Sequence, residues 1–235
     1  MEIVPSVYQL SMSHTNVILI AEKEITLIDT GSRGSSARIL KFVRRLGRSA
    51  REIGLIILTH NHLDHVGGLA DLKRLTGARV AAHKDDITDS ESELPYRPFL
   101  FKLLRNPFVS NLRPLAYFKS SDVDLPLHGG EVLPPLGGLV VVHTPGHTPG
   151  SISLFAPGRR LLIAGDALNG RFRRLHLPPR MVTTDLRRAV DSLNTIAKLD
   201  FDILCLGHGG PLTRDVPEKL RRLIDASHAR EAAKS

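Results

Sequence analysis

Four potential metal ligands stand within six residues of the segment His60-Asn61-His62-Leu63-Asp64-His65. The segment follows directly on the apolar run 53–58 and Thr59. Imidazole and carboxylate groups suit zinc and its first-row neighbours. A buried cluster of such groups is costly unless something satisfies it, and a bound cation does so. So many ligands beside one strand end can close on more than one ion, and the segment predicts a metal-dependent hydrolase.

Three later segments share one local pattern, in which a short apolar run leads to a glycine and a ligand-type residue. Short, continuously apolar runs are typical of strands buried in a layered core. Each run therefore delivers one ligand from a strand end. The preceding glycine lacks a Cβ, which permits a sharp exit from the strand and a close approach of the backbone to an ion. The three ligand-type residues are His147, Asp166 and His208.

The order His60-x-His62-x-Asp64-His65, followed by His147, Asp166 and His208, resembles the signature of the metallo-β-lactamase superfamily. The resemblance runs from about residue 16 to about residue 210 and leaves out only the segment 87–127. It implies an α+β fold, the four-layer αββα sandwich, with the ligands meeting along one edge. The superfamily includes glyoxalase II-type thioesterases, lactonases, lactamases, phosphodiesterases and nucleases, so the resemblance specifies the fold and the metal chemistry better than the substrate.

The resemblance also implies a dinuclear centre with a role for each ligand. Two divalent ions would share a water and provide a metal-bridging hydroxide for attack on the substrate. Zinc is expected, and iron or manganese accept the same donors. Asp64 has a second, catalytic role, as the group that orients the nucleophile and accepts its proton. The first ion would be held by His60, His62 and His147, the second by Asp64, His65 and His208, and Asp166 would bridge the two.

The substrate class follows from the region around His147, whose sequence Thr-Pro-Gly-His-Thr-Pro-Gly resembles the glyoxalase II and lactonase branches. The lactonases usually carry a tyrosine three residues after the bridging aspartate, where this chain has Asn169. The long helical extension of glyoxalase II is not expected after His208. The prediction is therefore hydrolysis of an ester, thioester or lactone in a modest-sized, partly apolar small molecule. Alternatives are a phosphodiesterase or phosphotriesterase, a nuclease, a di-iron redox protein and a non-catalytic scaffold.

Composition limits the remaining classes. With 235 residues, 42% of them apolar, the chain fits one domain over 1–235. The N-terminus resembles no secretory signal and no run of eighteen apolar residues occurs, so a cytoplasmic location without membrane contact is expected. The single cysteine, Cys205, is expected to be buried. The net charge of +8 and the basic run 171–174 could serve an anionic group, but the scattered basic residues do not favour nucleic acid.

The segment 87–127 is predicted to be an insert. Its part 96–118 holds half of the chain's eight phenylalanines and two of its three tyrosines among basic residues. Such an amphipathic stretch can form a lid over the metal site, a contact between two subunits or part of the core. The lid, with a contribution to a homodimer contact, is the preferred hypothesis.

Two further residues are given supporting roles. Asp29 is predicted to hold the histidine segment through hydrogen bonds, with a simple turn as the alternative. His83 is predicted to start a helix or to be structural, and not to bind metal. The apolar patterns predict helices at about 35–46, 68–76, 185–198 and 215–233, and strands at about 7–10, 17–21, 25–28, 53–58, 79–82, 131, 139–142, 152–155, 161–164 and 203–206.

Overall fold

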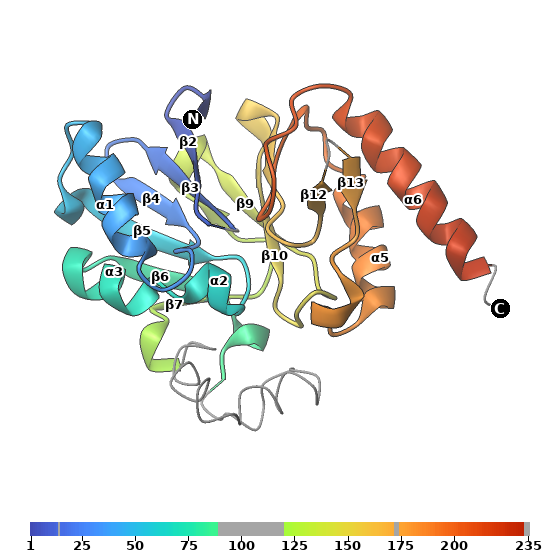
Figure 1. Ribbon diagram of the computed structural model, residues 1–235, viewed down its shortest axis with the longest axis horizontal. Coiled ribbons are helices and arrows are strands. Elements are labelled where there is room, and N and C mark those ends of the chain that lie inside the picture. Colours follow the sequence, from blue (N-terminus) through green and yellow to red (C-terminus); the bar gives the residue numbers. More distant parts are fainter. Residues whose placement is uncertain (14, 89–119, 172–173, 233–235) are drawn as a thin grey trace. The chain divides into compact units, whose positions relative to one another are not determined.

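The computed structural model describes residues 1–13, 15–88, 120–171 and 174–232. The chain divides into two compact units, Met1–His128 and Gly129–Ser235, and each is built on one main β-sheet (Figure 1). Most of the predicted insert, with its lid and dimer hypotheses, lies outside the described residues. The single domain over 1–235 stays a prediction. In the described part of the chain, no helix combines the length and the apolar character that a membrane span needs.

The sheet of the first unit has seven strands in chain order. The first four pair antiparallel, and the pairs from β4 to β7 are parallel. The antiparallel part is the meander predicted from the sequence, with one more strand before it. The strands are β1 (Glu2–Val4), β2 (Val7–Ser11), β3 (Asn16–Ala21), β4 (Ile25–Ile28), β5 (Ile53–Leu58), β6 (Arg79–His83) and β7 (Leu125–Leu127).

Helices α1 (Ser35–Arg45) and α3 (Leu69–Thr76) pack on one face of this sheet (Figure 1). Ile39 and Val43 of α1 lie one turn apart and share a buried cluster with Ile56 of β5. The alternate residues of the strands are buried as well, so both faces of the sheet are removed from water. The short helix α2 (Leu63–Val66) carries the second half of the histidine segment.

The main sheet of the second unit has five strands in the order β14-β11-β10-β9-β8. Helices α5 (Leu186–Ile196) and α6 (Val216–Ala232) share one buried cluster with its strands. The hairpin of β12 (Asn169–Arg171) and β13 (Arg174–His176) forms a sheet of its own. The strands of the main sheet are β8 (Val132–Leu133), β9 (Leu139–His143), β10 (Ile152–Ala156), β11 (Leu161–Ile163) and β14 (Ile203–Cys205).

Short 3₁₀ turns join several of these elements. They are Ala50–Glu52, Lys84–Asp86, Ser120–Asp122, Pro135–Gly137, Pro157–Arg159 and Arg180–Val182.

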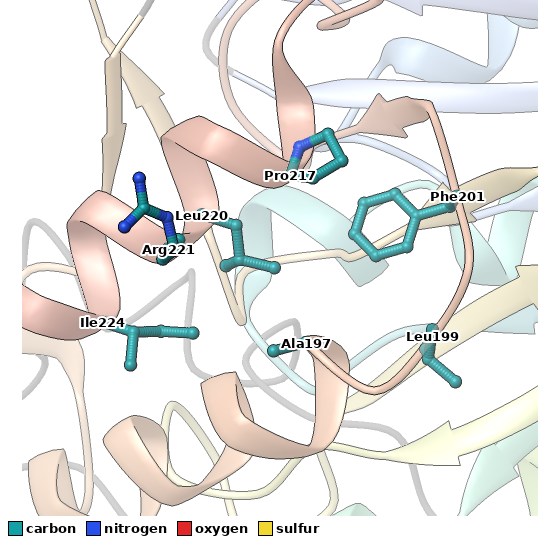
Figure 2. Close-up of a pocket in the computed structure, with 7 residues that line it drawn as sticks. All are labelled: Ala197, Leu199, Phe201, Pro217, Leu220, Arg221 and Ile224. Carbon is teal, nitrogen blue, oxygen red and sulfur yellow. The ribbon is translucent and has the colours of Figure 1, made fainter.

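Helix α6 packs incompletely on the connection from α5 to β14. Figure 2 shows the pocket that remains there, with Leu220 and Ile224 of α6 on one side and Phe201 on the other. The pocket has a volume of about 330 Å³, and its lining is apolar except for Arg221. The helix is buried at Val216 and Leu220 and again at Ser227, on the far side of this pocket along the helix.

Strands β11 and β14 form the parallel pair from which two predicted ligands emerge. Ile163 lies opposite Cys205, and the ladder continues through the hydrogen bond from Gly207 N to Gly165 O (2.8 Å). At the opposite end of the pair, the Arg160 guanidinium makes two hydrogen bonds with the Asp202 carboxylate (2.6 and 3.0 Å). This bidentate contact links the residues that precede the two strands.

Cys205 is fully buried in β14, as predicted, and burial raises the pKa of its thiol to about 12. The thiolate form is therefore disfavoured, and the side chain acts as a small apolar core group.

Candidate metal centre

The histidine segment begins where β5 ends and continues into α2, so its ligand-type side chains gather at one strand end of the first unit. The ring centroids of His60 and His62 are 4.8 Å apart, and those of His60 and His65 are 4.1 Å apart. Ligand atoms of Asp64 and His65 lie within 4.8 Å of each other. His60 and His65 are buried, whereas the Asp64 side chain is 37% exposed. The first unit thus brings together all four ligands predicted in it.

Asp29 supports this cluster through both of its carboxylate oxygens. Oδ1 accepts from the backbone N–H of Thr59 (2.8 Å), and Oδ2 accepts from the hydroxyl of Thr59 (2.8 Å) and from Nδ1 of His65 (2.7 Å). Asp29 has a φ of 63°, in the left-handed region that aspartate tolerates better than most residues. The predicted supporting role of Asp29 is confirmed.

The hydrogen bonds define which nitrogen of His60 and His65 can bind a metal. Since the Asp29 carboxylate can only accept, Nδ1 of His65 carries the proton and Nε2 carries the lone pair. The Thr59 hydroxyl donates to Asp29 and so accepts from Nδ1 of His60 at 3.0 Å. Both rings therefore present Nε2 as a donor atom, the state that a metal-binding histidine requires.

The second unit brings its three predicted ligands together around one carboxylate. Asp166 Oδ2 lies 3.5 Å from Nε2 of His147 and 3.0 Å from Nε2 of His208. Asp166 and His208 each stand three residues beyond the paired residues Ile163 and Cys205, so the ladder of β11 and β14 places them at the same level. Two ligand atoms that bind one tetrahedral zinc ion at about 2.0–2.1 Å lie about 3.4 Å from each other. The distances from Asp166 Oδ2 to the two histidine nitrogens are close to this value.

His147 is positioned by the segment before α5. Thr183 Oγ1 donates to Pro179 O (2.8 Å) and lies 3.4 Å from Nδ1 of His147, from which it can accept. The backbone O of His147 accepts from both the N–H (3.0 Å) and the hydroxyl (3.1 Å) of Thr184. The ring of His147 thus also presents Nε2 as its donor atom.

Gly146 has a use beyond the one expected. Its φ is 133°, and a Cβ there would lie 2.2 Å from the backbone N of Ala189 in α5. The glycine therefore admits the backbone of a helix, and this contact sets the position of the adjacent His147.

Replacing Thr183 with valine should weaken metal binding by about tenfold, because the His147 ring loses the group that fixes its orientation. Serine at the same position keeps the hydroxyl and should bind metal as the unchanged protein does. The measurement is metal affinity by competition with a chromophoric chelator, together with the melting temperature of each variant. Equal affinities of the valine and serine variants would show that Thr183 does not position the ring.

The predicted helix-start role of His83 is confirmed, and the expectation that it binds no metal stays a prediction. His83 precedes the 3₁₀ turn Lys84–Asp86, and its Nδ1 accepts from the backbone N–H of Asp85 at 3.3 Å. Asn61 is held within the histidine segment by the buried Asp86, whose carboxylate accepts from the Asn61 N–H at 3.1 Å.

Three hydroxyl residues that support the site were not predicted. Thr59 stands beside the motif and could have been found, because a hydroxyl next to His60 can bond both its ring and an acceptor nearby. Thr183 and Thr184 lie more than thirty residues from His147 and carry no motif. Of the basic run 171–174, residues 172 and 173 lie outside the described part, so its anionic partner stays a prediction.

The comparisons with known proteins give the family. The model of the metallo-beta-lactamase superfamily matches residues 11–208, and the chain belongs to this superfamily. It is a metal-dependent hydrolase, and the α+β metallo-β-lactamase fold predicted from the sequence is confirmed.

Similar proteins include several hydrolases. The "Probable metallo-hydrolase YflN" of Bacillus subtilis is 30% identical over 90% of this chain and 87% of its own length. The "Hydroxyacylglutathione hydrolase GloC" of Haemophilus influenzae is 28% identical over 82% of this chain and 83% of its own length. The solved structure of the metallo-beta-lactamase family protein TTHA1429 from Thermus thermophilus matches with a TM-score of 0.77 and 26% identity, over 99% of this chain and 82% of that chain.

Proposed function

We propose that this chain is a dinuclear hydrolase of ester, thioester or lactone bonds in a small, partly apolar molecule. The observation that carries the proposal is the position of Asp166 Oδ2 between Nε2 of His147 and Nε2 of His208. A carboxylate oxygen facing the lone pair of His147 Nε2 is unfavourable unless a proton or a metal cation offsets the repulsion, and the neighbouring donor nitrogens favour a metal. The donor set of this unit therefore fits metal ions bridged by Asp166.

The family resemblance supports the division of the other ligands. In this proposal His60, His62 and His147 hold one ion, Asp64, His65 and His208 hold the other, and Asp166 bridges them. When bound, the ions supply a water of lowered pKa and polarise the oxygen of the substrate. The donors are nitrogen and oxygen, which suits zinc, with iron or manganese as alternatives.

The residues of the chain then orient the ligands and move the proton. Asp29 holds the rings of His60 and His65, the former through Thr59, and Thr183 holds that of His147. Asp64 is the partly exposed carboxylate of the segment, and it can accept a proton from the attacking water and pass it to the leaving group. Its exposure suits that role, because a proton acceptor must be reached by the substrate.

Two observations set the order in which the acyl substrates are to be tested. GloC is named as a hydrolase of hydroxyacylglutathione, which is a thioester, and it aligns with this chain over most of both lengths. Position 169 is an asparagine in strand β12, so no phenol is available there to assist the opening of a lactone. Thioesters are therefore the first substrates to test, followed by simple esters and then lactones.

The test is a hydrolysis panel of thioesters, esters, lactones and aryl phosphodiesters with metal-loaded protein. We expect about two metal ions per chain by elemental analysis and the highest kcat/KM on an acyl substrate. Asp64→Asn should lower kcat at least about a hundredfold, because the proton acceptor is lost.

A matched control removes a histidine outside the ligand set. His228 is exposed on α6, and His228→Ala should retain both ions and the full activity. Hydrolysis of phosphodiesters alone would overturn the acyl proposal, and one ion or none per chain would overturn the dinuclear one.

A further inference from the structure

A second candidate site lies in the first unit, in a groove between α1 and the end of β2. The groove has a volume of about 760 Å³, which is within the range of small-molecule sites. We call it the α1 groove and define it by Leu10, Ser11, Arg38, Lys41, Phe42 and Arg45, which are among the residues that line it.

The cationic side chains of the α1 groove share one face of the helix. Arg38, Lys41 and Arg45 are spaced i, i+3 and i+7, so they lie within about 11 Å along the helix axis. All three are exposed, and no hydrogen bond or ion pair joins them to any residue in the described ranges. Arg48, one turn further on, differs, because it binds Glu52 and two backbone carbonyls.

The residues that line the α1 groove do not compensate its charge. No aspartate or glutamate occurs between Asp29 and Glu52, and no lining residue of the groove is acidic. Three cations held on one short helix face repel one another unless an anion lies among them. The α1 groove is thus a concave surface of a single charge sign, the arrangement that concentrates anions.

The shape and the floor of the α1 groove indicate the kind of anion. Leu10 is buried and Phe42 half-buried, which gives an apolar floor, and Ser11 adds an exposed hydroxyl at the end of β2. The guanidinium of an arginine can donate two parallel hydrogen bonds to the oxygens of one phosphate group. We propose that the α1 groove binds a small molecule that carries at least two phosphate groups on a partly apolar body, at a site separate from the metal ligands.

A membrane surface and a nucleic acid fit the groove less well. Met1 lines the groove as an exposed apolar side chain, but α1 itself adds no exposed large apolar side chain, and one methionine offers little surface to insert into a bilayer. A row of about 11 Å spans few phosphates of a polynucleotide strand, whereas a diphosphate ester fits within it.

The test uses ADP, inorganic pyrophosphate and adenosine as probes on the ¹⁵N-labelled, metal-loaded protein. We expect ADP and pyrophosphate to shift the backbone amide signals of Leu10, Ser11 and residues 38–45, with a Kd below about 1 mM in low salt. Adenosine should leave these signals unchanged. Each of Arg38→Gln, Lys41→Gln and Arg45→Gln should raise the Kd about three- to tenfold, because each removes one charged hydrogen-bond donor.

Arg44→Gln is the matched control, since Arg44 is exposed on the same helix but does not line the groove. It should change the Kd less than about twofold, and all four variants should melt at the same temperature as the unchanged protein. Equal losses for Arg44→Gln and Arg45→Gln would show unspecific charge attraction and overturn the proposal. Amide shifts confined to the His60–His65 segment would also overturn the proposal. The same holds if an oligonucleotide or an anionic vesicle binds more strongly than ADP.

Discussion

Replacing Asp166 with alanine should give a folded protein that retains fewer than two metal ions and has at least about a thousandfold lower kcat/KM. The reason is that one carboxylate oxygen of Asp166 faces the donor nitrogens of both His147 and His208, so its loss removes a ligand that the two ions would share. Elemental analysis and steady-state kinetics on the best substrate of the panel measure the two effects.

Asp166→Asn is the control that separates the charge of this side chain from its shape. It keeps an oxygen at the same place but loses the negative charge, so its metal content should lie between that of the alanine variant and that of the unchanged protein. Two tightly held ions in the alanine variant would contradict the bridging role of Asp166.

Asp29→Ala should lower the free energy of unfolding by about 2–4 kcal/mol and weaken metal binding by about ten- to a hundredfold. The alanine leaves the Thr59 N–H, the Thr59 hydroxyl and Nδ1 of His65 without the acceptor that now holds them. Alanine also disfavours the left-handed backbone conformation at position 29, where φ is 63°, so the variant is strained. Urea denaturation and chelator competition give the two quantities.

Asn at position 29 tolerates the left-handed backbone and still offers one acceptor. It should therefore recover part of the stability and less of the metal affinity, because a single amide oxygen replaces two carboxylate oxygens. If Asp29→Ala and Asp29→Asn bound metal as tightly as the unchanged protein, Asp29 would be a turn residue alone.

The residues that gather at the candidate metal centre could be predicted because each follows a recognisable strand. The runs before Asp166 and His208 are short and apolar, and a parallel pair of such strands brings the residues after them to the same level. The identity of the fold came from the family resemblance, since the spacing of strands alone permits several layered folds.

Four short strands were missed for physical reasons. β7 contains Pro126, which removes a hydrogen-bond donor and is tolerated there because β7 is the last strand of its sheet. β1 is the opposite edge strand and has only three residues. β12 and β13 are rich in arginine and histidine, and their pairing with each other defines them better than any apolar pattern.

The supporting residues show where the sequence is less informative. Asp29 could be predicted because it follows a strand and precedes Thr-Gly, as the family pattern has it. Thr183 and Gly146 act through the position of α5, which is set by tertiary packing and by the close contact of Gly146 with Ala189. Such contacts join residues about forty positions apart, and no local pattern in one sequence reports them.

The register of β11 and β14 has an entropic consequence. The backbone oxygen of Arg160 accepts from Asp202 N and Ile203 N where the two strands begin, and the backbone ladder runs on to the glycines before Asp166 and His208. Paired core strands are among the parts of a protein that open least often. The two side chains therefore start from fixed anchor points, and little conformational freedom remains to be lost when an ion arrives. A cation held between them would bind with a smaller entropy penalty than one bound by two loops.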